Sequence, residues 1–166
     1  EAAANLEFET AARLRDEARA LHERFNRDFW SEERGGYYVI GLDGDKRQID
    51  SMTSNMGHLL WSGIVPEERA RTIAAHLLSN RLFSGWGVRT LASSMGGYDP
   101  LGLHTGAVWP HDNAACAAGL VRYGFVEEAH RLVLAQLDAA QARGGRPTVL
   151  CGFDREDVRA PVRFPD

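Results

Sequence analysis

The chain has 166 residues, of which 44% are hydrophobic and 25% are charged, a composition typical of one soluble globular domain. Its net charge of −4 and the lack of Lys/Arg clusters argue against binding to nucleic acid. No apolar run approaches the roughly 18 residues that indicate a membrane-spanning helix, and the acidic, alanine-rich start does not resemble a signal peptide. Cys116 and Cys151 fit no metal-binding spacing. These features predict a reduced, cytoplasmic protein without a metal or other cofactor.

Residues 5–30 carry the clearest helical pattern of the chain, because apolar side chains recur there at helical spacing with Arg, Asp and Glu between them. The run Arg34-Gly35-Gly36 ends this pattern. Residues 37–49 are rich in aromatic and β-branched side chains around Asp43-Gly44, a strong tight-turn signal, and they predict one short β-hairpin. The apolar positions of the first helix are Leu14, Ala18, Leu21, Phe25 and Phe29.

Two pairs of helices are predicted after the hairpin. Their expected spans are residues 54–64, 66–80, 111–123 and 126–143. Ser54-Asn55 can cap the first of them, Pro66 suits a first helical turn, and Gly144-Gly145 ends the last. Trp61 is expected in the core. The positions expected to face neighbours are Met56, Leu60, Ile64, Ile73, Leu77 and Leu78, then Ala114, Ala118 and Val121, and then Val126, Ala129, Val133, Leu137 and Ala140.

The two helix pairs also resemble each other. Residues 63–70 are similar to residues 124–129, each between two predicted helices, at a period of about 60 residues. Repeated αα-hairpins predict a helical array or a toroid, with chance similarity as the alternative. Between the pairs, residues 81–110 form a long glycine-rich connection. A connection of this length is usually functional or disordered, and its aromatic residues argue against disorder.

The stretch His104–Asn113 gathers two histidines, an indole, a carboxylate and a carboxamide where a loop becomes a helix. Pro110 suits the first helical turn, and Asp112 falls where the helix dipole favours an acid. Such a cluster beside a helix start is typical of a binding or catalytic cleft. Asp112 is therefore either a helix-start acid or a residue of that cleft. Trp109 either packs in the core or stacks on a ligand ring.

Several other polar and aromatic residues are open to the same two interpretations. His104 and His111 can bind hydroxyl groups or be ordinary surface or core histidines, and no third ligand stands at metal-binding spacing. Trp86 is a second candidate for stacking, with core packing as the alternative. Asn55 can cap a helix or, with Asp50, reach the same cleft.

Four segments resemble those of bacterial glycogen-debranching proteins of the amylo-α-1,6-glucosidase type, in the same order and with matching spacing. They are DSMTSNMGHLLWSG (residues 50–63), GWGVRTLA (85–92), HTGAVWPHDN (104–113) and CGFDR (151–155). The resemblance covers most of the chain, from about Ala11 to Phe164. It implies an all-α fold of sequential αα-hairpins from an incomplete (α/α)6 toroid, forming a single domain over residues 1–166 with one short β-hairpin near 37–49.

The resemblance also implies an activity, inverting glycoside hydrolysis of α-glucans without a cofactor. Two carboxylic acids about 6.5–9.5 Å apart perform this reaction, one protonating the leaving oxygen and one activating water. The expected partner is an oligosaccharide or α-glucan, without nucleic acid or membrane. The residues expected to bind the substrate are Trp86, His104, Thr105, Gly106, Trp109, His111, Asp112 and Asn55.

Two features depart from the pattern of that family. Its general acid lies upstream of any segment that resembles this chain. Its general-base glutamate is replaced here by Thr148, and a threonine cannot act as a general base near neutral pH. Asp154, a few residues further on, is kept as a candidate beside its simpler interpretation as a turn charge. The alternative function is therefore a noncatalytic sugar-binding or helical interaction fragment. Half a toroid would expose apolar surface, which predicts self-association or packing against the missing half.

Overall fold

The structure is a computed structural model that describes residues 2–165, with side chains from Phe8 onward. Its helices are α1 (Ala2–Asp28), α2 (Asn55–Ser62), α3 (Glu67–Leu77), α4 (Pro110–Arg122) and α5 (Val126–Gln141), with a short 3-10 turn η1 at Glu33–Gly35. Its strands are β1 (Trp30–Ser31), β2 (Tyr37–Tyr38), β3 (Gly41–Leu42) and β4 (Gln48–Ile49). The predicted all-α fold of helical hairpins is confirmed. None of the described helices has the length and apolar character needed to cross a membrane.

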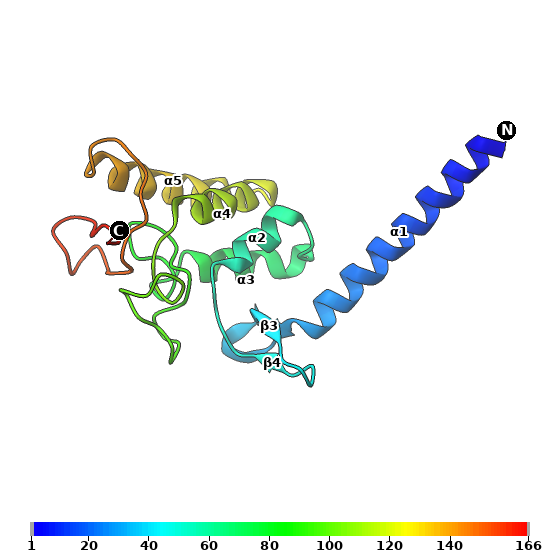
Figure 1. Ribbon diagram of the computed structural model, residues 1–166, viewed down its shortest axis with the longest axis horizontal. Helices are drawn as coiled ribbons and strands as arrows, with labels where there is room; N and C mark the ends of the chain where they lie inside the picture. The colour runs from blue at the N-terminus through cyan, green and yellow to red at the C-terminus, as the bar shows by residue number, and fades with distance from the viewer. Residues whose placement is uncertain (1, 166) are drawn as a thin grey trace.

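Helix α1 extends away from the rest of the molecule (Figure 1). Leu14 and Leu21 are each 53% exposed, so the apolar stripe that predicted the helix is not buried along most of its length. Only the last turns of α1 meet the body. There the ring of Phe25 stacks on Phe29 at 4.6 Å, and the amide of Asn26 donates to the carbonyl of Ile64 at 2.8 Å. The exposed stretch of α1 therefore adds little to the core.

The segment after α1 forms two antiparallel strand pairs, whereas the sequence analysis predicted one hairpin. Strands β3 and β4 form a hairpin within the predicted range, but β2 pairs back with β1, with Trp30 opposite Tyr38. The chain can reverse so tightly because Arg34, Gly35 and Gly36 all have positive φ. The reversal buries Tyr37 and Tyr38, which are each 1% exposed, against the core.

The two predicted αα-hairpins are present, α2 with α3 and α4 with α5. Gly63 follows α2 and Gly124 follows the end of α4, both with φ of 80°, so the repeated sequence marks equivalent turns. Helices α2 and α4 approach closely because small residues meet at their crossing. A Cβ atom on Gly119 would lie 2.5 Å from the carbonyl oxygen of Gly57.

The helix faces differ from those expected. Helix α4 buries Asn113, Cys116, Ala117, Gly119 and Leu120, and α5 buries Ala129, Leu132, Ala135 and Ala139. The expected contact positions Ala114, Ala118 and Val121 of α4 are exposed, as are Val126, Val133 and Leu137 of α5. Trp61 was expected in the core but is 56% exposed. The expected faces were wrong because the smallest side chains, and not the bulkiest, allow α2, α4 and α5 to pack closely.

The long segment between α3 and α4 is ordered by backbone pairing. Antiparallel β-bridges join Thr53 to Leu91, Arg89 to Val108, and Val108 to Leu150. The side chain of Asn113 adds to this pairing, since its oxygen accepts from the N–H of Val88 at 2.6 Å and its amide donates to the carbonyl of Val88 at 3.0 Å. These bridges bring three distant parts of the chain together beside the N-terminal ends of α2 and α4.

Candidate functional site

A cavity of about 530 Å³ lies where the N-terminal ends of α2 and α4 meet the bridged loops. Six of the eight residues predicted to bind a substrate line it. They are Asn55, His104, Thr105, Trp109, His111 and Asp112. The cavity is also lined by His58, Ser51, Thr53, Ser54, Thr90, Leu91 and Ile40, which the sequence analysis did not select. The structure therefore brings most of the predicted residues into one site and adds a second wall from residues 51–58.

Asp112 is the only carboxylate among the described residues that line this cavity. It lies in the first turn of α4, where the helix dipole favours a negative charge, and it is 7% exposed. Its Oδ1 is hydrogen-bonded to Nε2 of His58 on α2, while its Oδ2 is buried without a hydrogen-bond partner. The carboxylate thus retains acceptor capacity that no described residue uses.

His58 is the most informative residue that sequence reasoning missed. Its side chain is 42% exposed and lines the cavity beside Asp112, 54 residues away in sequence. A histidine that donates from Nε2 to a carboxylate keeps its Nδ1 as an acceptor, so the pair can accept hydrogen bonds from a ligand at both side chains. The position of His58 one helical turn after Ser54-Asn55, at the start of the same helix, was the available signal.

Trp109 forms the aromatic part of the cavity wall. His104 stacks on its indole with centroids 5.9 Å apart, and His111 meets it edge-on at 5.2 Å. The indole N–H donates to the carbonyl of Leu103 at 2.8 Å, so it is already used within the protein. Trp109 can therefore offer a ligand its apolar ring surface, with the histidines beside it as the groups that form hydrogen bonds.

Two predicted residues lie outside the cavity lining. Trp86 packs with Val108, Ala139 and Leu150 in a separate cluster, and the guanidinium of Arg155 lies 4.4 Å from its ring centroid. Gly106 is buried at a close backbone contact, where a Cβ atom would lie 2.1 Å from the carbonyl oxygen of Asp99. Gly106 therefore shapes the loop that carries His104 and Trp109 to the cavity.

Thr148 also lies apart from the cavity that contains Asp112. It lines a second cavity of about 650 Å³ together with Arg143, Arg146 and Arg163. The three guanidinium groups make the surroundings of Thr148 positive. No acidic side chain lines this cavity among the described residues.

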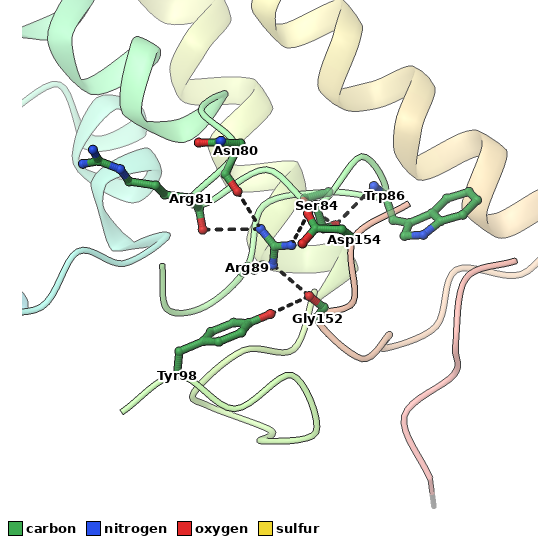
Figure 2. A network of polar contacts seen from close by, with 9 residues as sticks. Asn80, Arg81, Ser84, Trp86, Arg89, Tyr98, Gly152 and Asp154 are labelled. Atoms are coloured by element: carbon green, nitrogen blue, oxygen red, sulfur yellow. Dashed lines mark hydrogen bonds and ion pairs between the residues drawn. The ribbon is translucent and has the colours of Figure 1, made fainter. Parts of the chain in front are cut away.

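Asp154 serves a structural contact, shown in Figure 2. It binds Nη2 of Arg89 at 2.5 Å, and Arg89 is completely buried. The guanidinium also donates to the carbonyls of Gly152 at 2.8 Å and Asn80 at 3.1 Å, and Tyr98 donates to the same Gly152 carbonyl at 2.6 Å. Arg89 therefore ties the C-terminal segment to the loop after α3, which explains Asp154 without a catalytic role.

Asp50, the other acid considered for the cleft, is bound in a cluster at the start of the same loop. It accepts hydrogen bonds from the hydroxyl of Tyr37 and from Arg34 at 2.9 Å. Burial raises the pKa of Tyr37 to about 12, and the neighbouring carboxylate acts in the same direction. The adjacent residue Ser51 lines the cavity, while Asp50 itself does not.

No group of three or more His, Cys, Asp or Glu side chains is placed to hold a metal ion within the described part of the chain. The two cysteines are buried and unpaired. Burial raises the pKa of the Cys116 thiol well above its ordinary value, and the nearby charge of Asp112 adds to the increase. Cys116 is thus a small core side chain at the crossing of α2 and α4.

Comparison with known proteins places this fold among the six-hairpin glycosidases. The solved structure of the neutral trehalase Nth1 from Saccharomyces cerevisiae is similar, with a TM-score of 0.64 and 18% sequence identity over 80% of this chain. The match covers 25% of the trehalase chain, so this chain spans about a quarter of that protein. This is the likeness expected of an incomplete (α/α)6 toroid.

A family model specifies the assignment further. The model for the mannosylglycerate hydrolase MGH1-like glycoside hydrolase domain matches residues 1–150, and the chain belongs to this family. No curated protein matches the chain. The resemblance to glycogen-debranching proteins is thus supported at the level of the superfamily, and the amylo-α-1,6-glucosidase assignment stays a prediction.

Proposed function

We propose that the chain is a single-domain part of a glycosidase barrel that binds an α-glucan or a related glycoside in the cavity around Asp112. The observation that carries this proposal is the pairing of a polar and an aromatic wall in that cavity. Asp112 and His58 supply hydrogen-bonding groups, and Trp109 supplies an apolar ring surface. Sugar rings present both hydroxyl groups and an apolar face, so they suit such a site.

Hydrolysis by inversion requires two carboxyl groups about 6.5–9.5 Å apart. The cavity has a single carboxylate among its described lining residues, Asp112. Asp112 can bind a sugar hydroxyl or act as one member of the acid–base pair. The second member would have to come from a part of the barrel outside this chain, because Thr148 has no acidic group. We therefore propose that this chain binds the substrate and that hydrolysis needs a complete barrel.

Isothermal titration calorimetry with maltotriose, paired with an assay for released glucose, tests this function. Trehalose and mannosylglycerate serve as competing ligands, because the comparisons name hydrolases of these two sugars. The expected result is saturable maltotriose binding that weakens about tenfold or more in Asp112→Asn, as for loss of a hydrogen bond to a charged group. Asp45→Asn, at an exposed hairpin turn, is the matched control. Absence of binding by any of the three sugars would refute the proposal.

The role of Thr148 is tested in the same assays. Thr148→Glu places a carboxylate beside Arg143, Arg146 and Arg163, whose charges would keep it ionised. We expect this variant to release no glucose, because Thr148 lines a cavity separate from that of Asp112. Glucose release by Thr148→Glu alone would show that the missing base is the sole defect and would contradict the proposed need for a complete barrel.

A noncatalytic interaction role is the second candidate function. A groove of about 210 Å³ between α4 and α5 is lined by Ala114, Val133, Leu137 and Pro147 among others. Leu137 is 59% exposed, and Val121 and Val126 on the same helices are 56% and 60% exposed. Apolar surface of this extent favours association with another helical surface. This role would be the principal one if no sugar binds.

A further inference from the structure

Three of the four buried side-chain polar atoms that lack a hydrogen-bond partner belong to residues that line the same cavity. They are Oγ1 of Thr53, Oγ1 of Thr90 and Oδ2 of Asp112. A buried polar group without a partner costs about 1–3 kcal/mol, so folded proteins keep few of them. Their concentration in one cavity indicates that a ligand supplies the missing hydrogen bonds.

The backbone holds these three residues near one another. Thr53 pairs with Leu91 in a β-bridge, and the N–H of Ser54 donates to the carbonyl of Thr90 at 3.3 Å. The thiol of Cys116, one turn after Asp112 on α4, contacts the carbonyl of Ser54 at 3.6 Å. Residues 53–54 thus lie between Thr90 on one side and the first turns of α4 on the other.

The two threonines have no evident structural need for their hydroxyl groups. Thr53 is 3% exposed, and its hydroxyl makes no hydrogen bond within the described chain. A valine would fill the same volume without leaving a polar atom unpartnered, and β-branched residues suit these bridged positions equally. A hydroxyl at such a place lowers the stability of the free protein, which is a cost that a binding function explains.

We propose that Thr53, Thr90 and Asp112 form a polar floor that binds neighbouring hydroxyl groups of a sugar ring. This inference rests on the proposed function and adds the residues that recognise the ligand. Each threonine hydroxyl can donate one hydrogen bond and accept others, while the carboxylate only accepts. A pair of adjacent hydroxyls, each both donor and acceptor, matches this set. His58 holds Asp112 in place through the hydrogen bond to Oδ1.

The test compares the double variant Thr53→Val/Thr90→Val with Thr53→Ser/Thr90→Ser, which keeps both hydroxyls. The probe is glycerol, which has adjacent hydroxyls and no glycosidic bond, followed by NMR chemical shifts of the backbone amides of residues 53, 90 and 112. We expect glycerol to shift these amides in the original protein and the serine variant, with at least about tenfold weaker binding in the valine variant. The thermal midpoint of the valine variant should equal or exceed the original.

Each contrary result is decisive. The polar floor is refuted if the original protein shows no response to glycerol at these amides, if the valine variant responds equally, or if its thermal midpoint falls. A lower midpoint would mean that the hydroxyls have partners inside the protein. Failure of maltotriose to bind, with the glycerol response intact, would refute the α-glucan function and leave the polar floor standing for another polyhydroxylated ligand.

Discussion

Gly57 of α2 packs directly against Cys116 of α4, and a Cβ atom built on Gly57 would lie 2.2 Å from Sγ of Cys116 and 2.8 Å from its Cα. The contact with Cα involves backbone, so no rotation of a side chain can relieve it. This close approach fixes the distance between the two helices whose N-terminal ends carry His58 and Asp112. The geometry of the cavity therefore depends on a residue that never contacts the ligand.

Gly57→Ala is expected to destabilise the fold by about 1–3 kcal/mol, the range for overpacking a dense core. The measurement is chemical denaturation followed by circular dichroism. Gly44→Ala is the control, because a Cβ atom on Gly44 meets nothing within 4 Å and this residue lies in the exposed β3–β4 turn. Equal stability of Gly57→Ala and the original would show that α2 and α4 separate at no cost, against the contact described above.

Arg89→Met is expected to destabilise the protein by about 3 kcal/mol or more, because it strands the polar partners of a buried charge. The carbonyls of Gly152 and Asn80 and the carboxylate of Asp154 would lose their donor. Limited proteolysis should then cut the C-terminal segment near residues 150–155 first. The control Arg13→Met removes an exposed ion pair with Glu17 and should cost at most about 1 kcal/mol. Matching losses in the two variants would contradict the anchoring role of Arg89.

Acidification should destabilise the protein through His76. Burial lowers the pKa of this histidine below 6.5, and its Nε2 contacts the carbonyl of Gly36 at 2.9 Å. The unfolded state then binds the proton more readily than the folded state, so the unfolding free energy decreases as the pH falls through about 6.5. The measurement is urea denaturation at pH 7.5 and pH 5.5 for the original and His76→Gln.

The His76→Gln variant should lose less stability between these two pH values than the original. His130→Gln, at an exposed position of α5, should keep the full pH dependence. A pH dependence that is the same in all three proteins would exclude His76 as its source.

Self-association is expected through the exposed apolar side of α4 and α5. Multi-angle light scattering at high protein concentration should show a dimer or a larger species. Leu137→Glu places a charge in the groove between the two helices and should shift the population toward monomer. Leu101→Glu, at a loop position of similar exposure, should not. A strictly monomeric original protein would overturn this prediction.

The sequence was sufficient to predict the helices, because helical periodicity and end signals are local. The helices α2 to α5 begin and end within a few residues of the predicted bounds. Which faces are buried could not be predicted in the same way. The packing of α4 depends on how closely Gly57 and Gly119 let two distant helices approach, and nothing in the spacing of Ala114, Ala118 and Val121 reports on it.

The site was predictable to the extent that its residues are contiguous. The stretch His104–Asn113 supplied most of the correct lining residues because one loop carries them. His58, Thr53 and Thr90 were missed because they join the cavity through backbone bridges between segments far apart in sequence. Trp86 was selected for its aromatic ring, yet Arg155 and Leu150 enclose it in a separate cluster.

The backbone bridges among residues 53, 89–91, 108 and 150 have a consequence for how such a site can diversify. Main-chain pairing does not depend on which side chains the paired residues carry, apart from proline. The residues that line the cavity can therefore be exchanged one at a time while the framework that positions them persists. A single scaffold of this kind can acquire new ligand preferences through point substitutions at Thr53, Thr90 and His104, without any rearrangement of its helices.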